Sequence, residues 1–436
     1  MTESGYFDLS PTDRSLAVLD DTSPVTFHAV WDLIGHVDFE ALALAWQGLA
    51  RLHPILTCQT NVAMDSVWQP GPGLAPITLR SGAGLDQATS SELTAHLKLT
   101  AGPIVQLTAI TRTDGYRMVL AAHHSAFDGA ASVQLIDDLR RIYLDRCAGR
   151  PEPSAPDLSS RTVNAALQQY GISFTARQRL ITHGLDRWRK LPPSNHVDPL
   201  PGAIQDANGY FTIDLSAALD ALDEKRRRNS WPMDAVLVGL LERAWNEVFS
   251  SNPEGAGVWL VSSNLRSSLG LARGIGNLGG VEAVAMLSPQ SFDRLIEEAA
   301  AEIAVARLGF PGLGAELMAR SWGWMPPSVL NRGVEAMIRA GTRGRYTRIL
   351  SNLGRLPDSL ADWGEARLQG LRYLGPMTKG PYCLFVVMTH AGSSSLTVRT
   401  APGWFTDEHA RQLETAINQS CGLPSEPRSR DGSPTV

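Results

Sequence analysis

The amino-acid sequence predicts an α/β protein made of two lobes of similar size. Strand-like apolar runs alternate with helical apolar periodicity along the whole chain, a pattern typical of mixed α/β folds. The 436 residues leave room for two or three domains, because a domain usually takes about 150 residues. Two proline-rich stretches, 151–156 and 191–201, interrupt the pattern near its middle. We therefore place a domain boundary near residue 195.

The first lobe is expected to span residues 1–195. Helix 39–52 is predicted from apolar residues at helical spacing behind Asp38, a residue type that commonly caps helices. An Asp114-Gly115 turn predicts a hairpin between the strands on either side of it. The expected strands are 25–33, 55–62, 104–110 and 116–123, and the expected helices are 39–52, 85–99, 130–147 and 163–190.

The second lobe is expected to span residues 196–423. A strong amphipathic pattern predicts helix 233–249. The other expected helices are 292–307, 328–340 and 407–418, and the expected strands are 210–215, 258–264, 281–287, 347–353, 367–373, 383–390 and 395–400. Residues 424–436 contain three prolines and almost no apolar side chains, so we expect a disordered tail.

Charge and composition exclude several functional classes. Lysine and arginine number 39 against 44 aspartate and glutamate, a formal net charge of −5, so we expect no nucleic-acid partner. The four cysteines lie far apart without a Cys-x-x-Cys pair, which predicts reduced thiols and no zinc site. Residues 1–19 lack the basic start of a signal peptide, and no run approaches the roughly 18 apolar residues of a membrane span. We expect a cytoplasmic monomer without a membrane span.

The segment 121–132, AAHHSAFDGAAS, carries the residues best suited to chemistry. It predicts a strand that ends in His123 and His124, followed by a helix that opens at Asp128-Gly129. A histidine with an ordinary pKa of about 6.5 is partly neutral near pH 7 and can act as a base. Successive side chains of a strand point to opposite sides, so the two histidines should have different roles. Backbone N–H groups near Gly129 can stabilise a developing oxyanion.

The same residues also allow a purely structural interpretation. Adjacent histidines can end a buried strand, Asp128 can cap the helix, and Gly129 can relieve the turn, all without catalysis. The spacing alone does not decide between the two interpretations.

His123-His124-x-x-x-Asp128-Gly129 resembles the His-His-x-x-x-Asp-Gly signature of the chloramphenicol-acetyltransferase-like superfamily. That superfamily includes nonribosomal-peptide condensation domains, polyketide-associated and wax-ester acyltransferases, and plant acyl-CoA-dependent acyltransferases. Further segments follow the family's order over nearly the whole chain: RLHPIL at 51–56, AGPI at 101–104, NLR at 264–266, GN at 276–277 and SNLG at 351–354. The resemblance implies two α/β lobes that form a V, with an active-site tunnel at their interface.

The resemblance also implies roles for individual residues. His124 would be the catalytic base, His123 a supporting residue, and Asp128 a structural residue that pairs with an arginine of the second lobe. Arg266 stands at the position of that arginine, and a bidentate pair would lock the lobes together; a surface arginine after a strand is the alternative. Asn352 would donate an amide to the substrate or brace the tunnel, and a plain Asn-Leu-Gly turn fits it equally well.

The implied activity is acyl transfer from a thioester to a hydroxyl or amine. The donor would be acyl-CoA or an acyl phosphopantetheine on a carrier protein, and no metal or bound cofactor is expected, because the glycine-rich stretch 270–280 lacks the order of a dinucleotide site. The Asp-Phe-Gly-Trp-Gly motif of plant and fungal members is absent, and SWGW at 321–324 is no counterpart. This favours the bacterial condensation or polyketide-associated branch and a role in natural-product biosynthesis.

Two other functions stay open at this point. A non-catalytic condensation-like module would use the same fold to bind or recruit carrier proteins, and an epimerase or dehydratase-like relative would keep the same motif. Lys225, Arg226, Arg227 and Arg228 end a predicted helix, where an acidic carrier protein or the phosphates of coenzyme A could dock. A solvated helix end explains the same four residues without a partner.

Overall fold

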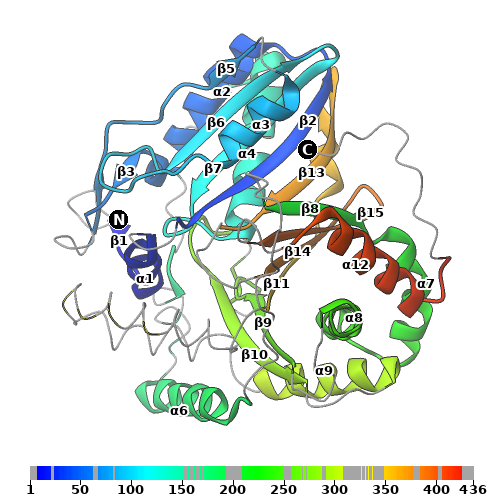
Figure 1. Cartoon of the computed structure of the whole chain (residues 1–436). Coiled ribbons are helices and arrows are strands. Elements are labelled where there is room, and N and C mark those ends of the chain that lie inside the picture. The colour runs from blue at the N-terminus through cyan, green and yellow to red at the C-terminus, as the bar shows by residue number, and fades with distance from the viewer. Residues whose placement is uncertain are drawn as a thin grey trace.

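The computed structural model describes residues 7–20, 24–61, 67–81, 84–151, 173–192, 209–249, 257–286 except 268 and 272, 291–307, 348–376, 383–400 and 405–424. It also describes positions 156, 161–163, 167, 171, 326, 329, 332 and 336. Figure 1 shows two α/β lobes, each with its own sheet, as the sequence predicts. Most of the predicted helix 328–340 and the predicted tail from residue 425 lie outside the described residues.

The first sheet joins six described strands in the order β12-β13-β2-β7-β6-β5. Alternate side chains of β2 face opposite sides, because the strand period is two residues: Trp31 packs in the core under α2 and α4, and Val30 packs against α3. Its elements are β2 (Thr26–Gly35), α2 (Phe39–Leu52), β5 (Thr78–Arg80), α3 (Leu85–Leu93), β6 (Val105–Arg112), β7 (Gly115–His123), α4 (Gly129–Cys147), β12 (Asp362–Trp363) and β13 (Ala366–Leu374).

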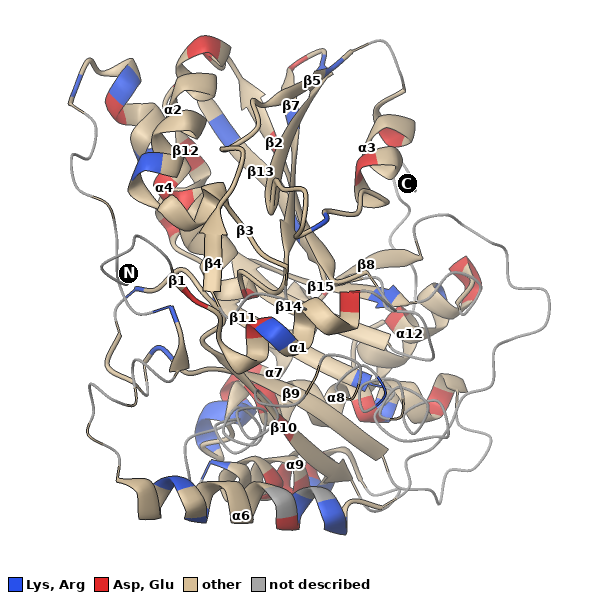
Figure 2. Ribbon diagram, turned by 90° about the vertical axis from the view of Figure 1, so that its left-hand side faces the viewer, with Lys and Arg blue, Asp and Glu red and all other residues tan. Residues whose placement is uncertain are grey.

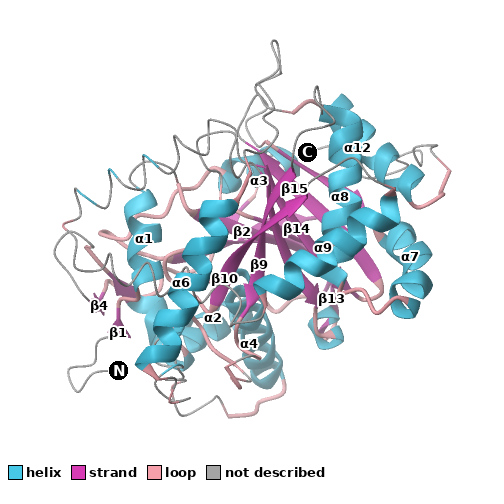
Figure 3. Ribbon diagram, turned by 90° about the horizontal axis from the view of Figure 1, so that it is seen from below, coloured by secondary structure: helices cyan, strands magenta, loops and turns pink. Residues whose placement is uncertain are grey.

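The second sheet joins six described strands in the order β10-β9-β11-β14-β15-β8. Seen from below, α8 and α9 lie together along this sheet (Figure 3), and both contribute to its core. Its elements are β8 (Tyr210–Asp214), α7 (Ser216–Arg228), α8 (Met233–Phe249), β9 (Gly257–Asn264), β10 (Gly279–Met286), α9 (Phe292–Ala306), β11 (Arg348–Arg355), β14 (Cys383–His390), β15 (Ser393–Thr400) and α12 (Asp407–Ser420).

The two sheets do not divide the chain at a single point. Strand β13 comes from the second half of the sequence, yet it pairs antiparallel with β2 of the first sheet, from Ala366 opposite Gly35 to Leu374 opposite His28. Residues of the predicted second lobe, 196–423, thus complete the first sheet. The predicted boundary near residue 195 lies outside the described residues and stays a prediction.

Three predicted elements differ from the observed ones. The predicted helix 163–190 is interrupted by a turn at Gly171, which has a φ of 65°, and the helix α6 (Phe174–Lys190) begins only after this turn. The predicted strand 55–62 is a 3-10 turn, η1 (Pro54–Thr57), followed by the two-residue strand β3 (Cys58–Gln59), because Pro54 fixes a helical φ at the start of the turn. The predicted helix 85–99 ends at Leu93 in α3. Beyond it the chain is held to the first sheet, since the N–H of Leu97 donates to the hydroxyl of Thr26.

Helix α1 (Pro11–Asp20) is absent from the predicted elements. Its start is a capping box: the Asp13 N–H donates to Ser10 Oγ at 3.0 Å, and the Ser10 N–H donates to Asp13 Oδ2 at 3.1 Å. The short strands β1 (Phe7–Asp8) and β4 (Val67–Pro70) lie beside it and pair with each other. Only Asp13, Ala17 and Val18 of the helix are buried, so its apolar pattern is weak.

Helix α6 (Phe174–Lys190) contacts β10 and α9 through the side chain of Arg187. Arg187 donates to the carbonyl of Ala283 in β10 at 2.9 Å and lies 3.2 Å from the Glu302 carboxylate in α9. Figure 2 shows the basic residues of α6 beside acidic residues of α9. Among the described residues, no helix combines the length and apolarity needed to cross a membrane.

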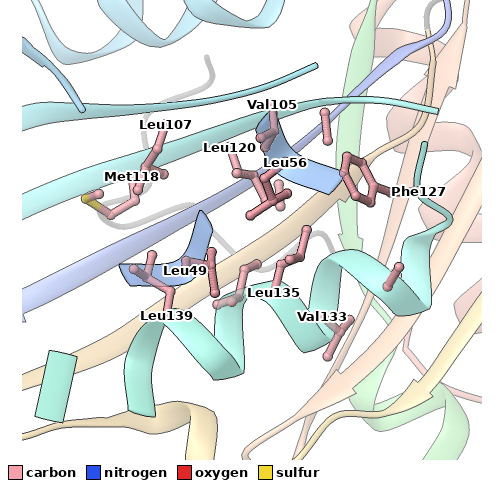
Figure 4. Close-up of a cluster of buried hydrophobic side chains, with 14 of the residues drawn as sticks. Leu49, Leu56, Val105, Leu107, Met118, Leu120, Phe127, Val133, Leu135 and Leu139 are labelled. Atoms are coloured by element: carbon pink, nitrogen blue, oxygen red, sulfur yellow. The ribbon is translucent and has the colours of Figure 1, made fainter. Parts of the chain in front are cut away.

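The core of the first lobe fixes the start of α4. Figure 4 shows Leu135 and Leu139 of α4 packed with Leu49 and Leu120, while Phe127 lies at the end where α4 begins. Phe127 has no exposed surface. A buried side chain immediately before a helix holds the entry of the chain in place, and so the core determines where the preceding histidines lie.

Candidate active site

The two histidines of the motif occupy the junction between β7 and α4. Strand β7 ends at His123 and α4 begins at Gly129, as the sequence predicts. The His124 ring lies edge-on to Phe27 with ring centroids 5.6 Å apart, on the side of the sheet that faces α4. His123 instead lies 3.3 Å from the Asp20 carboxylate. The histidines therefore point in different directions, as strand alternation requires.

His123 is fully buried, and its two ring nitrogens face different neighbours. Its Nδ1 accepts a hydrogen bond from the Ser125 N–H at 3.2 Å, and its Nε2 faces Asp20. Burial lowers the pKa of His123, and the Asp20 carboxylate opposes this only in part, so the pKa lies below its usual value of 6.5. His123 is therefore neutral near pH 7.

His124 is half-buried and has no acidic partner among the described residues. Its N–H donates to the Val25 carbonyl at 3.1 Å, which fixes the backbone. Its ring Nδ1 is buried without a hydrogen-bond partner in the part of the chain that the structure describes. The imidazole is thus oriented by packing against Phe27 and by its backbone, in contrast to a histidine held by a carboxylate in a catalytic triad.

Asp128 and Arg266 form the predicted pair between the lobes. The Arg266 guanidinium donates from Nη1 to Oδ2 and from Nη2 to Oδ1, both at 2.9 Å. Asp128 also caps α4 by accepting from the Ala131 N–H at 2.7 Å, and it accepts from the Leu278 N–H at 2.8 Å. Arg266 is 3% exposed. The alternative of a surface arginine is therefore wrong, and Asp128 both caps the helix and joins the lobes.

Gly129 brings the start of α4 against the second lobe. A Cβ placed on Gly129 would lie 2.8 Å from Cδ2 of Leu353 in β11, closer than real Cβ contacts allow. Glycine at this position permits the close approach. The backbone N–H groups of the first turn of α4 thus lie near the meeting surface of the lobes. Oxyanion stabilisation by these groups stays a prediction.

The turn after His124 is held by three residues that the sequence analysis did not identify as site residues: Asn277, Asp13 and Arg161. The amide Nδ2 of Asn277 lies 2.9 Å from the His124 carbonyl, 2.8 Å from the Ser125 carbonyl and 2.9 Å from Asp13 Oδ1. Arg161 donates to the Ala126 carbonyl at 3.1 Å. In the sequence, the glycine-asparagine pair at 276–277 could have drawn attention to Asn277, and the Ser10–Asp13 capping-box pattern to Asp13. No sequence pattern indicates Arg161.

Asp13 is the buried acid of this arrangement. It is 1% exposed, and burial raises its pKa above the usual value although the nearby Arg161 opposes the shift. The Trp68 indole donates to its Oδ2 at 3.2 Å, and Arg161 lies over the Trp68 ring. The turn that bears His124 is therefore bound to α1 by a buried polar network.

A second contact between the lobes lies further along α4. Asp138 has no exposed side-chain surface and lies 2.8 Å from His53 Nε2 and 2.5 Å from Arg273. Burial would raise its pKa, but these two partners outweigh burial and hold the pKa below its usual value. Between the two ion pairs, the Gly274 N–H donates to the Gln134 side chain at 3.1 Å. The loop 265–278 thus follows α4 for about three turns.

Asn352 has a structural role in the described contacts. Its Nδ2 donates to Asp234 at 2.8 Å and its Oδ1 accepts from the Gly354 N–H at 2.9 Å. These bonds brace the irregularity in β11, where the pairing register shifts between Asn352 and Gly354. A direct contact with substrate stays a prediction.

The four basic residues at the end of α7 are paired with carboxylates. Lys225 contacts Asp293, Arg226 and Arg227 both contact Asp223, and Arg228 contacts Glu224. Their charge is therefore largely balanced within the lobe, as expected for a solvated helix end. Carrier-protein docking at these residues stays a prediction. Among the described residues, no group of three or more His, Cys, Asp or Glu side chains is placed to hold a metal ion.

Solved structures share the overall fold over almost the whole chain. The first condensation domain of the CDA synthetase superposes with a TM-score of 0.71 at 12% identity, over 99% of this chain and 100% of that domain. Polyketide synthase associated protein 5 from Mycobacterium tuberculosis gives a TM-score of 0.66 at 17% identity, over 94% and 98%. The chain has the two-lobed condensation-domain fold. A third structure with this fold is the starter condensation domain of rhizomide synthetase in complex with C8-CoA. It superposes with a TM-score of 0.68 at 14% identity, over 96% of this chain and 95% of that chain.

Sequence similarity to curated proteins is confined to part of the chain. The phthiocerol/phthiodiolone dimycocerosyl transferase of Mycobacterium leprae is 28% identical over 209 residues, which are 45% of this chain and 49% of that enzyme. The enzyme of the same name from Mycobacterium tuberculosis (strain H37Rv) is 30% identical over 147 residues, 32% and 34% of the two chains. The chain thus matches about half or less of the length of these relatives. No family model matches this condensation-fold chain.

Proposed function

We propose that the protein is an acyltransferase that moves an acyl group from a thioester to a hydroxyl or amine acceptor. The observation that carries the proposal is the junction of β7 and α4: a half-buried His124, free of any acid partner in the described residues, sits on a turn held by both lobes. A relative of partial length is named a dimycocerosyl transferase, and the fold is that of condensation domains. The donor is acyl-CoA or a carrier-protein thioester.

In this proposal His124 acts as the general base. The neutral imidazole takes the proton of the acceptor O–H or N–H while that atom attacks the thioester carbonyl carbon. The carbonyl oxygen becomes an oxyanion, which backbone N–H groups at the start of α4 stabilise. The carbon–sulfur bond then breaks, and the imidazolium returns the proton to the departing thiolate. No acyl-enzyme forms, and neither a metal nor a bound cofactor takes part.

The remaining expectations belong to the same proposal. The acyl and acceptor substrates would meet between the lobes, in the tunnel that the family resemblance implies. A cytoplasmic location agrees with the free state of Cys58, Cys147, Cys383 and Cys421, since reduced thiols are typical of reducing compartments. The monomeric state stays a prediction.

Thiol release from a panel of acyl thioesters, with and without alcohols and amines, tests the function. We expect acceptor-dependent release that falls on the order of 100-fold or more in His124→Ala, because a general base is lost, with an unchanged melting temperature. The matched control is His36→Ala, since His36 is exposed and lies outside the site. Binding without turnover over the whole panel would favour a non-catalytic carrier-binding module, and an acyl-enzyme that accumulates without acceptor would refute direct transfer.

A further inference from the structure

Behind the histidine motif, Asp20 links the protein surface to the buried His123. Asp20 is the last residue of α1. Its Oδ1 accepts from the Val25 N–H at 2.9 Å. Its Oδ2 faces two imidazoles, with His96 Nε2 at 2.8 Å and His123 Nε2 at 3.3 Å. The side chains of His96, Asp20 and His123 are 35%, 12% and 0% exposed, so the carboxylate lies between solvent and the core.

The hydrogen bonds of His123 determine its tautomer. A ring nitrogen that accepts a hydrogen bond carries no proton. Because Nδ1 accepts from the Ser125 N–H at 3.2 Å, the proton of the neutral ring must be on Nε2, which faces Asp20. The contact with Asp20 is longer and less well aligned than the one that His96 makes. In the described part of the chain, however, no other acceptor contacts this Nε2.

The charge state of these groups agrees with the geometry. His123 has a lowered pKa and is neutral near pH 7. Burial would raise the pKa of Asp20, but His123, the Val25 N–H and His96 outweigh it and hold the pKa below its usual value. Asp20 is therefore an anion, and the neutral His123 ring turns its Nε2 toward this carboxylate at 3.3 Å in an electrostatic contact that lacks the alignment of a hydrogen bond. The other titratable groups that act on His123 are His124 and His96, and both lower its pKa.

We propose that Asp20 is a positioning residue for the acyl-transfer step: it selects the Nε2–H tautomer of His123, which lets Nδ1 hold the Ser125 N–H and so fixes the turn that bears His124. The inference rests on the proposed function, in which His124 is the base. It assigns to α1 a role in catalysis without contact to substrate. It also explains why a neutral, buried imidazole precedes the base: His123 transmits the position of α1 to the backbone that follows His124.

Two substitutions at Asp20 separate this role from simple packing. In Asp20→Asn the amide oxygen still accepts the hydrogen bond from the Val25 N–H, so the amide NH₂ faces His123 Nε2. A donor at this place favours the tautomer of His123 that carries its proton on Nδ1. Nδ1 then carries a proton opposite the Ser125 N–H. In Asp20→Ala, water can enter beside this partly exposed position and accept from Nε2, which leaves the tautomer intact. We expect kcat to decrease in the order parent, Asp20→Ala, Asp20→Asn, with a loss of about 10-fold or more in the asparagine variant and little change in KM.

The reverse order would overturn the proposal, because an isosteric asparagine is the milder change if Asp20 only packs. Equal kcat values in all three proteins would also overturn it. Asp114→Asn serves as the matched control, since Asp114 is exposed and pairs with Arg112 in the hairpin turn. Melting curves of all variants identify any loss of folding.

Nitrogen NMR of histidine-labelled protein gives a readout that does not depend on activity. The His123 signals are assigned by their disappearance in His123→Gln. We expect Nδ1 unprotonated and Nε2 protonated in the parent, and the opposite in Asp20→Asn. A proton on Nδ1 in the parent would refute the inference whatever the activity. If no protein released thiol but the tautomers behaved as expected, the proposed function would fail while the assignment of the tautomer to Asp20 would stand.

Discussion

At the scale of single residues, three carbonyls and the one carboxylate of the turn from His124 to Asp128 accept hydrogen bonds from outside the turn. Its carbonyls accept from Asn277 and Arg161, and the Asp128 carboxylate accepts from Arg266. A buried charge that loses its partner costs more than an exposed one, because water cannot replace the partner. The position of His124 therefore depends on residues distant in the sequence.

The pair of Asp128 and Arg266 should behave as one unit. We expect each of Asp128→Ala and Arg266→Ala to lower the free energy of unfolding by about 3 to 5 kcal/mol, because either change leaves a buried charge unpaired. The double variant should cost less than the sum, with a coupling of about 1 kcal/mol or more in denaturant unfolding. Arg266→Ala combined with Asp114→Ala is the control and should be additive within about 0.5 kcal/mol. Additivity in the first pair would mean that the contact contributes nothing specific.

Buried histidines should make the protein less stable in mild acid. Burial, aided by Arg399, holds the pKa of His28 well below its usual 6.5. Because the pKa of His28 is lower in the folded protein than in the unfolded chain, the unfolded chain binds more protons in mild acid. The stability present above pH 6.5, the pKa in the unfolded chain, is therefore lost as the pH falls below that value. We expect the unfolding free energy to decrease below pH 6.5, by at most about 1.4 kcal/mol per pH unit for each such histidine.

Urea unfolding of His28→Gln at pH 7 and pH 5.5 checks this dependence. The variant should lose less stability between the two pH values than the parent does. His36→Gln, which changes an exposed histidine, should keep the full dependence. An identical change in all three proteins would show that His28 does not titrate on unfolding.

At the scale of elements, strong local patterns were predictable and long-range contacts were not. Helix α8 and strand β7 follow from their periodicity, and the motif 123–129 is contiguous. Helix α1 buries few residues, so its periodicity is too weak to find. The contact between Asp128 and Arg266 was anticipated only through the family resemblance, and that between Asp13 and Asn277, 264 positions apart, was not, because local pattern carries no information about tertiary contacts.

The loop 265–278 should influence turnover through Asn277. We expect Asn277→Ala to lower kcat in thiol release, because the His124 and Ser125 carbonyls lose a shared donor. The unfolding free energy should decrease by about 1 to 3 kcal/mol for the buried groups left unpaired. Asn229→Ala is a control at an exposed helix end. Unchanged kcat with lowered stability would limit Asn277 to a structural role.

At the scale of the whole molecule, β13 ties the two halves of the chain together. Without β12 and β13, residues 1–195 would present β2 as an open sheet edge, and an open apolar edge favours aggregation. We expect this fragment alone to lack the cooperative unfolding of the full chain, and to recover it when produced together with residues 196–436. Circular dichroism during denaturation measures this. A fragment 1–195 that unfolds cooperatively by itself would show that the first lobe is independent of β13.

The pairing of β2 with β13 also imposes an order on biosynthesis. Gly35 and Ala366 are neighbours in the sheet, so the ribosome must produce more than three hundred further residues after β2 before its partner exists. The second sheet draws all its described strands from residues 210–400, and most of it therefore emerges while the first is still incomplete. The nascent chain holds its histidine-bearing lobe open until translation is nearly finished, a period in which holdase chaperones would bind the unpaired edge of β2.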